Sequence, residues 1–266
     1  MMKVIHIVII SSMILLVSCN NNNRIAVEKL NKQIDSLNST ISSLNSEIED
    51  LEIENPFVRK LQTEASTCLI IQFVPKGLDI KLHSVRPSFN DSTYFCVPAA
   101  FTSPETTIEG VFIENGKVVN KVKNNGINGF VMFSKNECII DKLENLSDSI
   151  MATSISKNHN LFQQILLVNN SNIVKCELFK DRKNTRRAII KYGNGAIFIA
   201  ETHRPVTILE FQKALVEIGV KDALYLDMGS WSEGWYRSSS CERLRIGELF
   251  SNTSKQTNWL TFERKK

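Results

Sequence analysis

One acidic residue of the chain follows directly on a regular strand–helix–strand pattern. The pattern spans residues 196–226, and Asp227 comes immediately after its second strand. In such a unit, ligand-handling groups usually collect at the C-terminal ends of the strands. A carboxylate placed there can act as a base, as a nucleophile or as a stabiliser of positive charge. The alternative is that Asp227 only caps the next turn, as Asp before Gly often does.

Two neighbouring segments also carry side chains capable of chemistry. His203 lies in the loop 201–204 after the first strand, and it is either a general acid/base or an ordinary loop histidine. The segment after Asp227 combines aromatic rings with an arginine, which suits sugar stacking and anion contact. The alternative is that its tryptophan rings pack under the loop as a lid on the core. The residues of this segment are Ser230, Trp231, Trp235, Tyr236 and Arg237.

Local signals define the elements that must position these groups. Residues 193–195 (Gly-Asn-Gly) predict a turn before a buried strand at 196–200. Thr207 and Glu210 have the spacing of a capping box, which predicts a helix over 208–218. Gly219 supplies the left-handed residue that ends this helix.

The remaining apolar runs complete an α+β domain built on a mixed sheet. A further helix is predicted over 142–149. The predicted strands are 68–74, 94–98, 110–114, 129–133, 164–168, 187–191, 196–200, 223–226 and 259–262.

The region from about residue 92 to 262 resembles the phosphodiester glycosidase family. Arg187-Ala188 matches the family's strand-opening arginine, and residues 223–227 match its Ala-Leu-aromatic-Leu-Asp run. Further matching segments follow in the family's order: 108–117, 128–130, 164–170, 205–207 and 257–262. Such an ordered series is far more specific than any single motif.

The resemblance implies hydrolysis of a sugar-1-phosphodiester, with a phosphorylated sugar or glycan as the partner. Arg187 would hold the phosphodiester oxygens with its planar fork, and Arg186 would point to the other face of the strand. Asp227 would act at the anomeric carbon. A second carboxylate, either Glu109 or Glu201, would assist.

Two departures from the family pattern bear on activity. Residues 97–101 (Val-Pro-Ala-Ala-Phe) lack the family's asparagine, and Met228 replaces the first glycine of a Gly-Gly pair. A methionine there would crowd the backbone at Gly229, which is meant to approach a ligand closely. The chain is therefore an active hydrolase or a glycan-binding or phosphodiester-binding lipoprotein that has lost turnover. In a third reading it is a structural envelope protein with this domain as its head.

The N-terminus predicts a bacterial lipoprotein. Residues 1–18 form a signal peptide whose apolar run is too short to cross a bilayer, and residues 16–19 resemble a lipobox. Cys19 would carry acyl chains such as palmitate, and 19–26 would be a tether. This places the protein in the cell envelope, anchored to a membrane on its periplasmic or surface side. The alternative is an ordinary cleaved signal with a chance cysteine.

Residues 27–54 predict a coiled coil ahead of a globular domain at 60–266. β-Branched residues at one seam position and leucines at the other favour a parallel homodimer through 27–51. The alternative is a single amphipathic helix folded onto its own domain. The seam consists of Val27, Ile34, Ile41 and Ile48 with Leu30, Leu37, Leu44 and Leu51.

Composition excludes several other functions. The net charge of +4 is dispersed without a basic aromatic stripe, so no nucleic-acid partner is expected. The histidines have no metal-ligand spacing, so no cofactor is expected, although a divalent metal stays open. Beyond Cys19, the cysteines indicate buried core residues, with one or two disulfides as the alternative: Cys68, Cys96, Cys138, Cys176 and Cys241.

Overall fold

The computed structural model describes residues 28–40, 57–64, 68–90, 92–135, 137–178, 181–229, 231–247 and 253–264. The chain divides into two units, Met1–Ile53 and Glu54–Lys266. In the first, residues 28–40 are helical, and the seam residues Leu30, Ile34 and Leu37 are exposed. The other seam positions, the leader and Cys19 lie outside the described residues, so the coil, its dimer and the lipid anchor stay predictions. Among the helices described, none is both long and apolar enough to span a bilayer.

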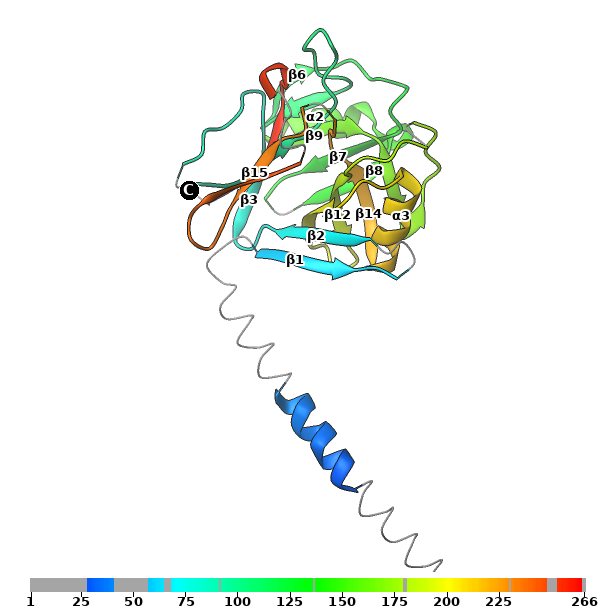
Figure 1. The fold of residues 1–266 in the computed structure, drawn as a ribbon. Helices are drawn as coiled ribbons and strands as arrows, with labels where there is room; N and C mark the ends of the chain where they lie inside the picture. The colour runs from blue at the N-terminus through cyan, green and yellow to red at the C-terminus, as the bar shows by residue number, and fades with distance from the viewer. Residues whose placement is uncertain are drawn as a thin grey trace, which may run out of the picture. The chain divides into compact units, whose positions relative to one another are not determined.

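The second unit consists mainly of three antiparallel sheets (Figure 1). Sheet 1 has the order β1 (Phe57–Gln62), β2 (Leu69–Val74), β13 (Ile197–Thr202), β12 (Arg187–Tyr192), β14 (Val220–Tyr225), β10 (Leu166–Asn169) and β11 (Asn172–Ile173). Sheet 2 has the order β16 (Arg243–Ile246), β15 (Gly234–Arg237), β4 (Thr93–Pro98), β17 (Trp259–Arg264) and β3 (Leu78–His83). Sheet 3 has the order β6 (Lys117–Asn120), β5 (Phe112–Glu114), β9 (Asn160–Gln164), β7 (Gly129–Phe133) and β8 (Cys138–Lys142). The helices are α2 (Asp148–Ser156) and α3 (Ile208–Glu217), with 3-10 turns η2 (Leu143–Asn145) and η3 (Thr253–Lys255).

The predicted mixed sheet is wrong, because all strand pairs of the described residues are antiparallel. β13 and β14 run parallel to each other, as the strand–helix–strand pattern predicts. They are not neighbours, since β12 lies between them and pairs antiparallel with both. Helix α3 connects β13 to β14 and packs against β14, β10 and β11, so that it lies against sheet 1 in Figure 1.

Alternation along β12 creates two separate cores. Ile189 faces a core shared by all three sheets, which also contains Phe95, Phe162 and Leu260. The residues on either side of Ile189 face a second core, where sheet 1 packs against α3. Each fully buried large apolar side chain contributes about 1.5–3 kcal/mol relative to exposure. The two faces of β12 are thereby fixed, and with them the direction of every side chain on the strand.

The local signals around α3 are confirmed. Thr207 and Glu210 form the predicted capping box, and Gly219 adopts φ +82° just after the helix. The other predicted helix is displaced, because Ser147 caps α2 at Asp148 and only a short 3-10 turn precedes it.

The cysteines of the described residues are all free thiols. Cys68, Cys96 and Cys138 are buried, as predicted, whereas Cys176 is half-buried and Cys241 exposed. Burial raises the pKa of Cys96 and of Cys138 to about 12, so these thiols are unreactive near neutral pH.

Candidate active site

Asp227 lies where three segments distant in sequence converge. It follows β14 with only Leu226 between, and its backbone N–H donates to the carbonyl of Ala99 at 2.9 Å. Its carboxylate accepts hydrogen bonds from the Thr102 backbone and from the Gln256 side chain. The end of β14, the loop after β4 and the segment before β17 therefore all hold this carboxylate.

Burial raises the pKa of Asp227 from 3.8 to about 7. The hydrogen bonds from Thr102 and Gln256 and the charge of Arg187 act in the opposite direction but do not compensate. Desolvation is the largest cause because it penalises the charged form. Near neutral pH the carboxyl is thus present both protonated and ionised, which suits a group that exchanges protons in a reaction.

Two carboxamide side chains that the sequence did not indicate, Gln256 and Asn258, hold the segments around Asp227. Gln256, which is 7% exposed, donates from Nε2 to the carbonyl of Asn258 at 3.2 Å, and its buried Oε1 has no hydrogen-bond partner among the described residues. Asn258 is fully buried and binds both backbone groups of Ala100, with its Oδ1 2.6 Å from the N–H and its Nδ2 3.0 Å from the carbonyl. Asn258 therefore fixes the loop that carries Thr102.

Arg187 and Glu201 form a buried ion pair beside Asp227. They face each other across β12 and β13, and Arg187 Nε donates to Glu201 Oε2 at 2.6 Å. A second donor of Arg187 binds the carbonyl of Ser232 at 3.1 Å, and Glu201 Oε1 accepts from the N–H of Gly247 at 3.2 Å. Arg187 is 0% exposed, and these partners hold its guanidinium. The ion pair therefore stabilises the loops at Ser232 and Gly247. The sequence instead predicts a direct contact between Arg187 and phosphate.

Arg186 points to the other face of β12, as predicted. Its guanidinium donates to the carbonyl of Val206 at 3.2 Å and to the hydroxyl of Tyr225 at 3.1 Å. It therefore belongs to the core beneath α3 and not to the surroundings of Asp227.

The replacement of a family glycine by Met228 is accommodated in the core. The Met228 side chain packs in the core beneath α3, together with Tyr225. Gly229 has φ +153°, and a Cβ added there would meet no atom within 4 Å. Because the Met228 side chain packs into the core, it leaves the backbone at Gly229 uncrowded, and the predicted crowding does not occur.

Comparison with known proteins identifies the domain. A family model described as phosphodiester glycosidase matches residues 92–264. The chain belongs to the phosphodiester glycosidase family. A search of curated proteins found no match.

Two solved structures share the fold of this phosphodiester glycosidase domain at low sequence identity. One is the zebrafish N-acetylglucosamine-1-phosphodiester alpha-N-acetylglucosaminidase catalytic domain, auto-inhibited by its pro-peptide. It is 15% identical, with a TM-score of 0.54 over 79% of this chain and 83% of that chain. The other is a hypothetical protein from Synechocystis, 10% identical, with a TM-score of 0.56 over 77% of this chain and 61% of that one. The family match thus makes the chain a relative of hydrolases, and the structures add agreement of fold.

The two remaining acid/base candidates of this glycosidase domain lie in different places. Glu109 is close to the site through its backbone, which donates to the carbonyl of Phe101 at 2.8 Å, while its carboxylate accepts from Asn124 at 2.9 Å. His203 is exposed in the turn after β13, where its backbone N–H binds Leu69, and no contact with Asp227 is described.

The aromatic segment after Asp227 is largely packed into the fold. Trp235 is 1% exposed and packs in a buried cluster with Cys96 and Trp259, which corresponds to the lid alternative. Arg237 is also buried and stacks on Phe89 and Tyr94. Trp231 is half-buried, and Ser230 lies outside the described residues.

The described residues contain no group of three or more His, Cys, Asp or Glu side chains that could hold a metal ion.

Proposed function

We propose that this protein hydrolyses the bond between the anomeric carbon of a sugar and a phosphodiester oxygen, with Asp227 as the general base. One observation carries the proposal. Asp227 occupies the family's aspartate position, where three segments of the fold converge on its carboxylate, and burial raises its pKa to about 7. A base with its pKa near the working pH is the most effective at removing a proton.

In the proposed step, Asp227 takes a proton from a water molecule. The water oxygen bonds to the anomeric carbon, and the carbon–oxygen bond to phosphate breaks, with its electron pair leaving on the phosphate oxygen. A phosphate monoester has a second pKa of about 6, so it departs without a strong acid to protonate it. Ordinary glycosidases use two carboxylates, but this leaving group needs only one.

The surroundings of Asp227 support a single catalytic carboxylate. Glu201 is neutralised by Arg187 at 2.6 Å, and the carboxylate of Glu109 is bound by Asn124. Thr102 and Gln256 act as positioning residues, because their hydrogen bonds hold the Asp227 carboxylate.

The proposed enzyme works at a membrane surface in the cell envelope. The lipobox at 16–19 and the heptads of 27–51 support an acylated Cys19 and a parallel homodimer that holds the domain away from the bilayer. The substrate is then a phosphodiester-linked sugar in an envelope polymer or a host glycan. Mass spectrometry of the mature N-terminus tests the acylation, and Cys19→Ser should release the protein from the membrane fraction.

A second candidate is a binding lipoprotein of the same fold without turnover. The burial of Arg187 favours glycan binding over hydrolysis, because that side chain has no exposed surface with which to hold a phosphodiester for cleavage. The missing family asparagine in 97–101 points the same way.

One experiment separates the two candidates. The full chain, Asp227→Ala and the control Glu144→Gln, an exposed residue, are incubated with a panel of sugar-1-phosphodiesters. Sugar release by wild type and Glu144→Gln but not by Asp227→Ala supports the hydrolase. Saturable binding without release by any of them would establish the binding protein instead.

A further inference from the structure

A cavity of about 450 Å³ lies between β3 and the end of sheet 3. None of its lining residues contacts Asp227 or belongs to the segments that hold it. Its volume falls within the range of small-molecule sites, about 300–1,000 Å³. Its charged and imidazole side chains include Lys81, His83, Glu114, Lys135, Lys157 and His159.

The sheet 3 wall of this cavity is locked in place. The N–H of Gly116 donates to the carbonyl of His159 at 2.9 Å, and the N–H of Asn115 donates to Asn160 Oδ1, also at 2.9 Å. Gly116 adopts φ +78°, and a Cβ there would come within 2.7 Å of the Ile155 carbonyl. The β5–β6 turn and the turn after α2 therefore form one rigid surface.

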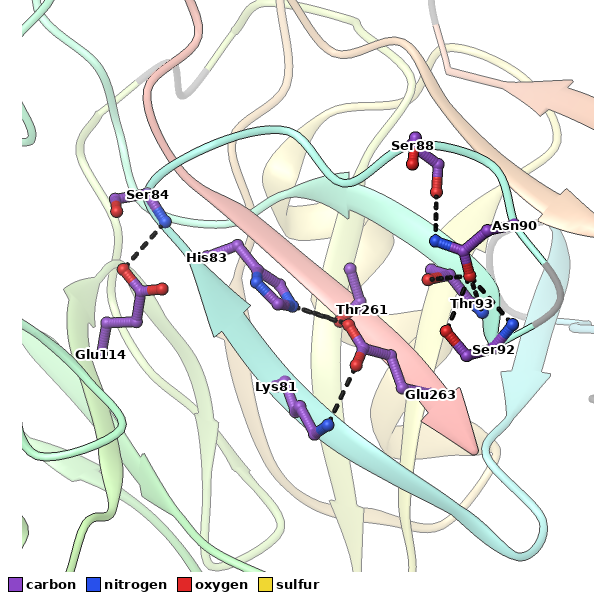
Figure 2. A network of polar contacts seen from close by, with 10 residues as sticks. All are labelled: Lys81, His83, Ser84, Ser88, Asn90, Ser92, Thr93, Glu114, Thr261 and Glu263. Atoms are coloured by element: carbon purple, nitrogen blue, oxygen red, sulfur yellow. Dashed lines mark hydrogen bonds and ion pairs between the residues drawn. The ribbon is translucent and has the colours of Figure 1, made fainter. Parts of the chain in front are cut away.

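The β3 wall is equally organised, as Figure 2 shows. Glu263 binds His83 at 2.7 Å and Lys81 at 2.9 Å, and these contacts lower the pKa of Glu263 to about 2. Glu114 accepts a hydrogen bond from the N–H of Ser84 at 3.0 Å, which joins β3 to sheet 3. Since β3 is the outermost strand of sheet 2, its free edge faces the cavity.

Two lysines of the sheet 3 wall, Lys135 and Lys157, are exposed, and the carboxylates of Asp79 and Glu114 line the same cavity without pairing with them. Lys135 and Lys157 form no ion pair within the described part of the chain. His159 is 8% exposed, and its ring Nδ1 has no hydrogen-bond partner there. An unsatisfied buried group of this kind calls for an explanation, and a bound ligand that orders the ring supplies one.

We propose that this cavity binds a sugar that carries a phosphate monoester. The ammonium groups of Lys135 and Lys157 would hold the phosphate as point charges. The carboxylates of Asp79 and Glu114 would accept hydrogen bonds from sugar hydroxyls. The site stands apart from the proposed hydrolase centre and does not depend on turnover there.

The histidines of the described residues provide an internal test. His83 and His159 line the cavity, whereas His203 is exposed in the turn after β13. The full chain, with ¹³C-labelled histidine rings, is titrated with glucose 6-phosphate and separately with glucose. We expect saturable shifts of the His83 and His159 resonances with glucose 6-phosphate, no shift of His203, and at least tenfold weaker binding of glucose.

Substitution of the two lysines tests whether glucose 6-phosphate binds in this cavity. Lys135→Ala combined with Lys157→Ala should weaken glucose 6-phosphate binding by about tenfold or more, since a charged hydrogen bond contributes about 1.5–3 kcal/mol. Lys213→Ala, an exposed lysine on α3, is the matched control and should bind as wild type. Ligand-free histidine spectra that match wild type show that the variants are folded. Shifts without saturation, shifts equal at His203, or unchanged binding by the double variant would each overturn the proposal.

The same titration keeps this site distinct from the hydrolase. Asp227→Ala should retain the His83 and His159 shifts whether or not the wild type releases sugar. Loss of those shifts in Asp227→Ala would mean that glucose 6-phosphate occupies the Asp227 site, and the cavity would carry no ligand.

Discussion

The carboxylate of Asp227 accepts a hydrogen bond from the side chain of Gln256, a residue that stands just before the last strand of the fold. This contact joins the end of sheet 1 to the beginning of β17 in sheet 2. It favours the ionised carboxylate, and burial favours the neutral one. The balance between the two sets the pH at which the proposed base becomes active.

Activity should rise with pH through about 7, the pKa of Asp227. The base works only when ionised, so kcat/KM should fall tenfold per pH unit well below that pKa. Asp227→Asn should lower turnover by about 10²–10⁴-fold, the usual contribution of a general base. A pH–rate profile on the best phosphodiester of the panel measures both effects. A flat profile between pH 5 and 8 would contradict the assignment of Asp227 as the base.

Substitution of Gln256 should move the midpoint of this pH–rate profile to higher pH. In Gln256→Ala the carboxylate loses a hydrogen bond that lowers its pKa, so the midpoint should move above 7. Gln256→Glu should move it further, because a second carboxyl beside Asp227 disfavours ionisation. The same pH–rate measurement tests this. A lower kcat with an unmoved midpoint would show that Gln256 is only structural.

The raised pKa of Asp227 should also lower the free energy of unfolding at alkaline pH. The folded pKa of about 7 exceeds the ordinary value of 3.8, so the favourable contribution is complete below pH 4 and disappears as the pH rises through 7. About three pKa units correspond to at most about 4 kcal/mol. Asp227→Asn should therefore be about 2–4 kcal/mol more stable than wild type at pH 8 and nearly equal at pH 4. Urea unfolding of both proteins at the two pH values measures this difference, and an equal difference at pH 4 and pH 8 would contradict the prediction.

The Arg187–Glu201 pair should behave as a buried bridge. Arg187→Met removes the counterion of the buried Glu201 and should cost about 3–5 kcal/mol, whereas adding Glu201→Leu should recover most of that loss. The exposed Lys142–Glu144 pair, 3.5 Å apart, is the control, and Glu144→Gln should change stability by less than about 0.5 kcal/mol. Chemical unfolding measures all four proteins. Equal stability of the single and double variants would refute the bracing role.

Removal of residues 24–55 should convert a dimer into a monomer. The seam of Val27–Leu51 is the only strong association signal in the sequence, and the part of it that the structure describes exposes Leu30 and Leu37. Sedimentation of the full and shortened chains gives the masses. An unchanged mass would show that the helix is a spacer.

Apolar runs made the inner strands predictable. β2, β4, β7, β12 and β17 lie within one or two residues of their predicted positions, because they are buried on at least one face. β3 and β16 were missed, because charged residues such as Lys81 and Arg243 interrupt these two edge strands of sheet 2. Such strands are specified by pairing with a neighbour, and the local sequence carries little sign of them.

The candidate site was predictable only in part. Asp227 and Arg187 were selected through the ordered family motifs, and the charge of Arg187 acts on the Asp227 carboxyl in the structure. The environment of Arg187 was not predictable, because its burial depends on the loops at Ser232 and Gly247. The role of Gln256 could not be predicted, because its side chain reaches Asp227 only when β17 pairs with β4.

The position of β17 has a consequence for biosynthesis. This strand occupies residues Trp259–Arg264 and pairs with β3 and β4, whose residues are made far earlier. Contacts so remote along the chain form late in folding. The segment carrying Gln256 and Asn258 cannot enclose Asp227 until residues 256–264 have been synthesised and β17 has paired. Under the lipoprotein prediction the chain is exported unfolded, and we then expect the site to assemble only after export.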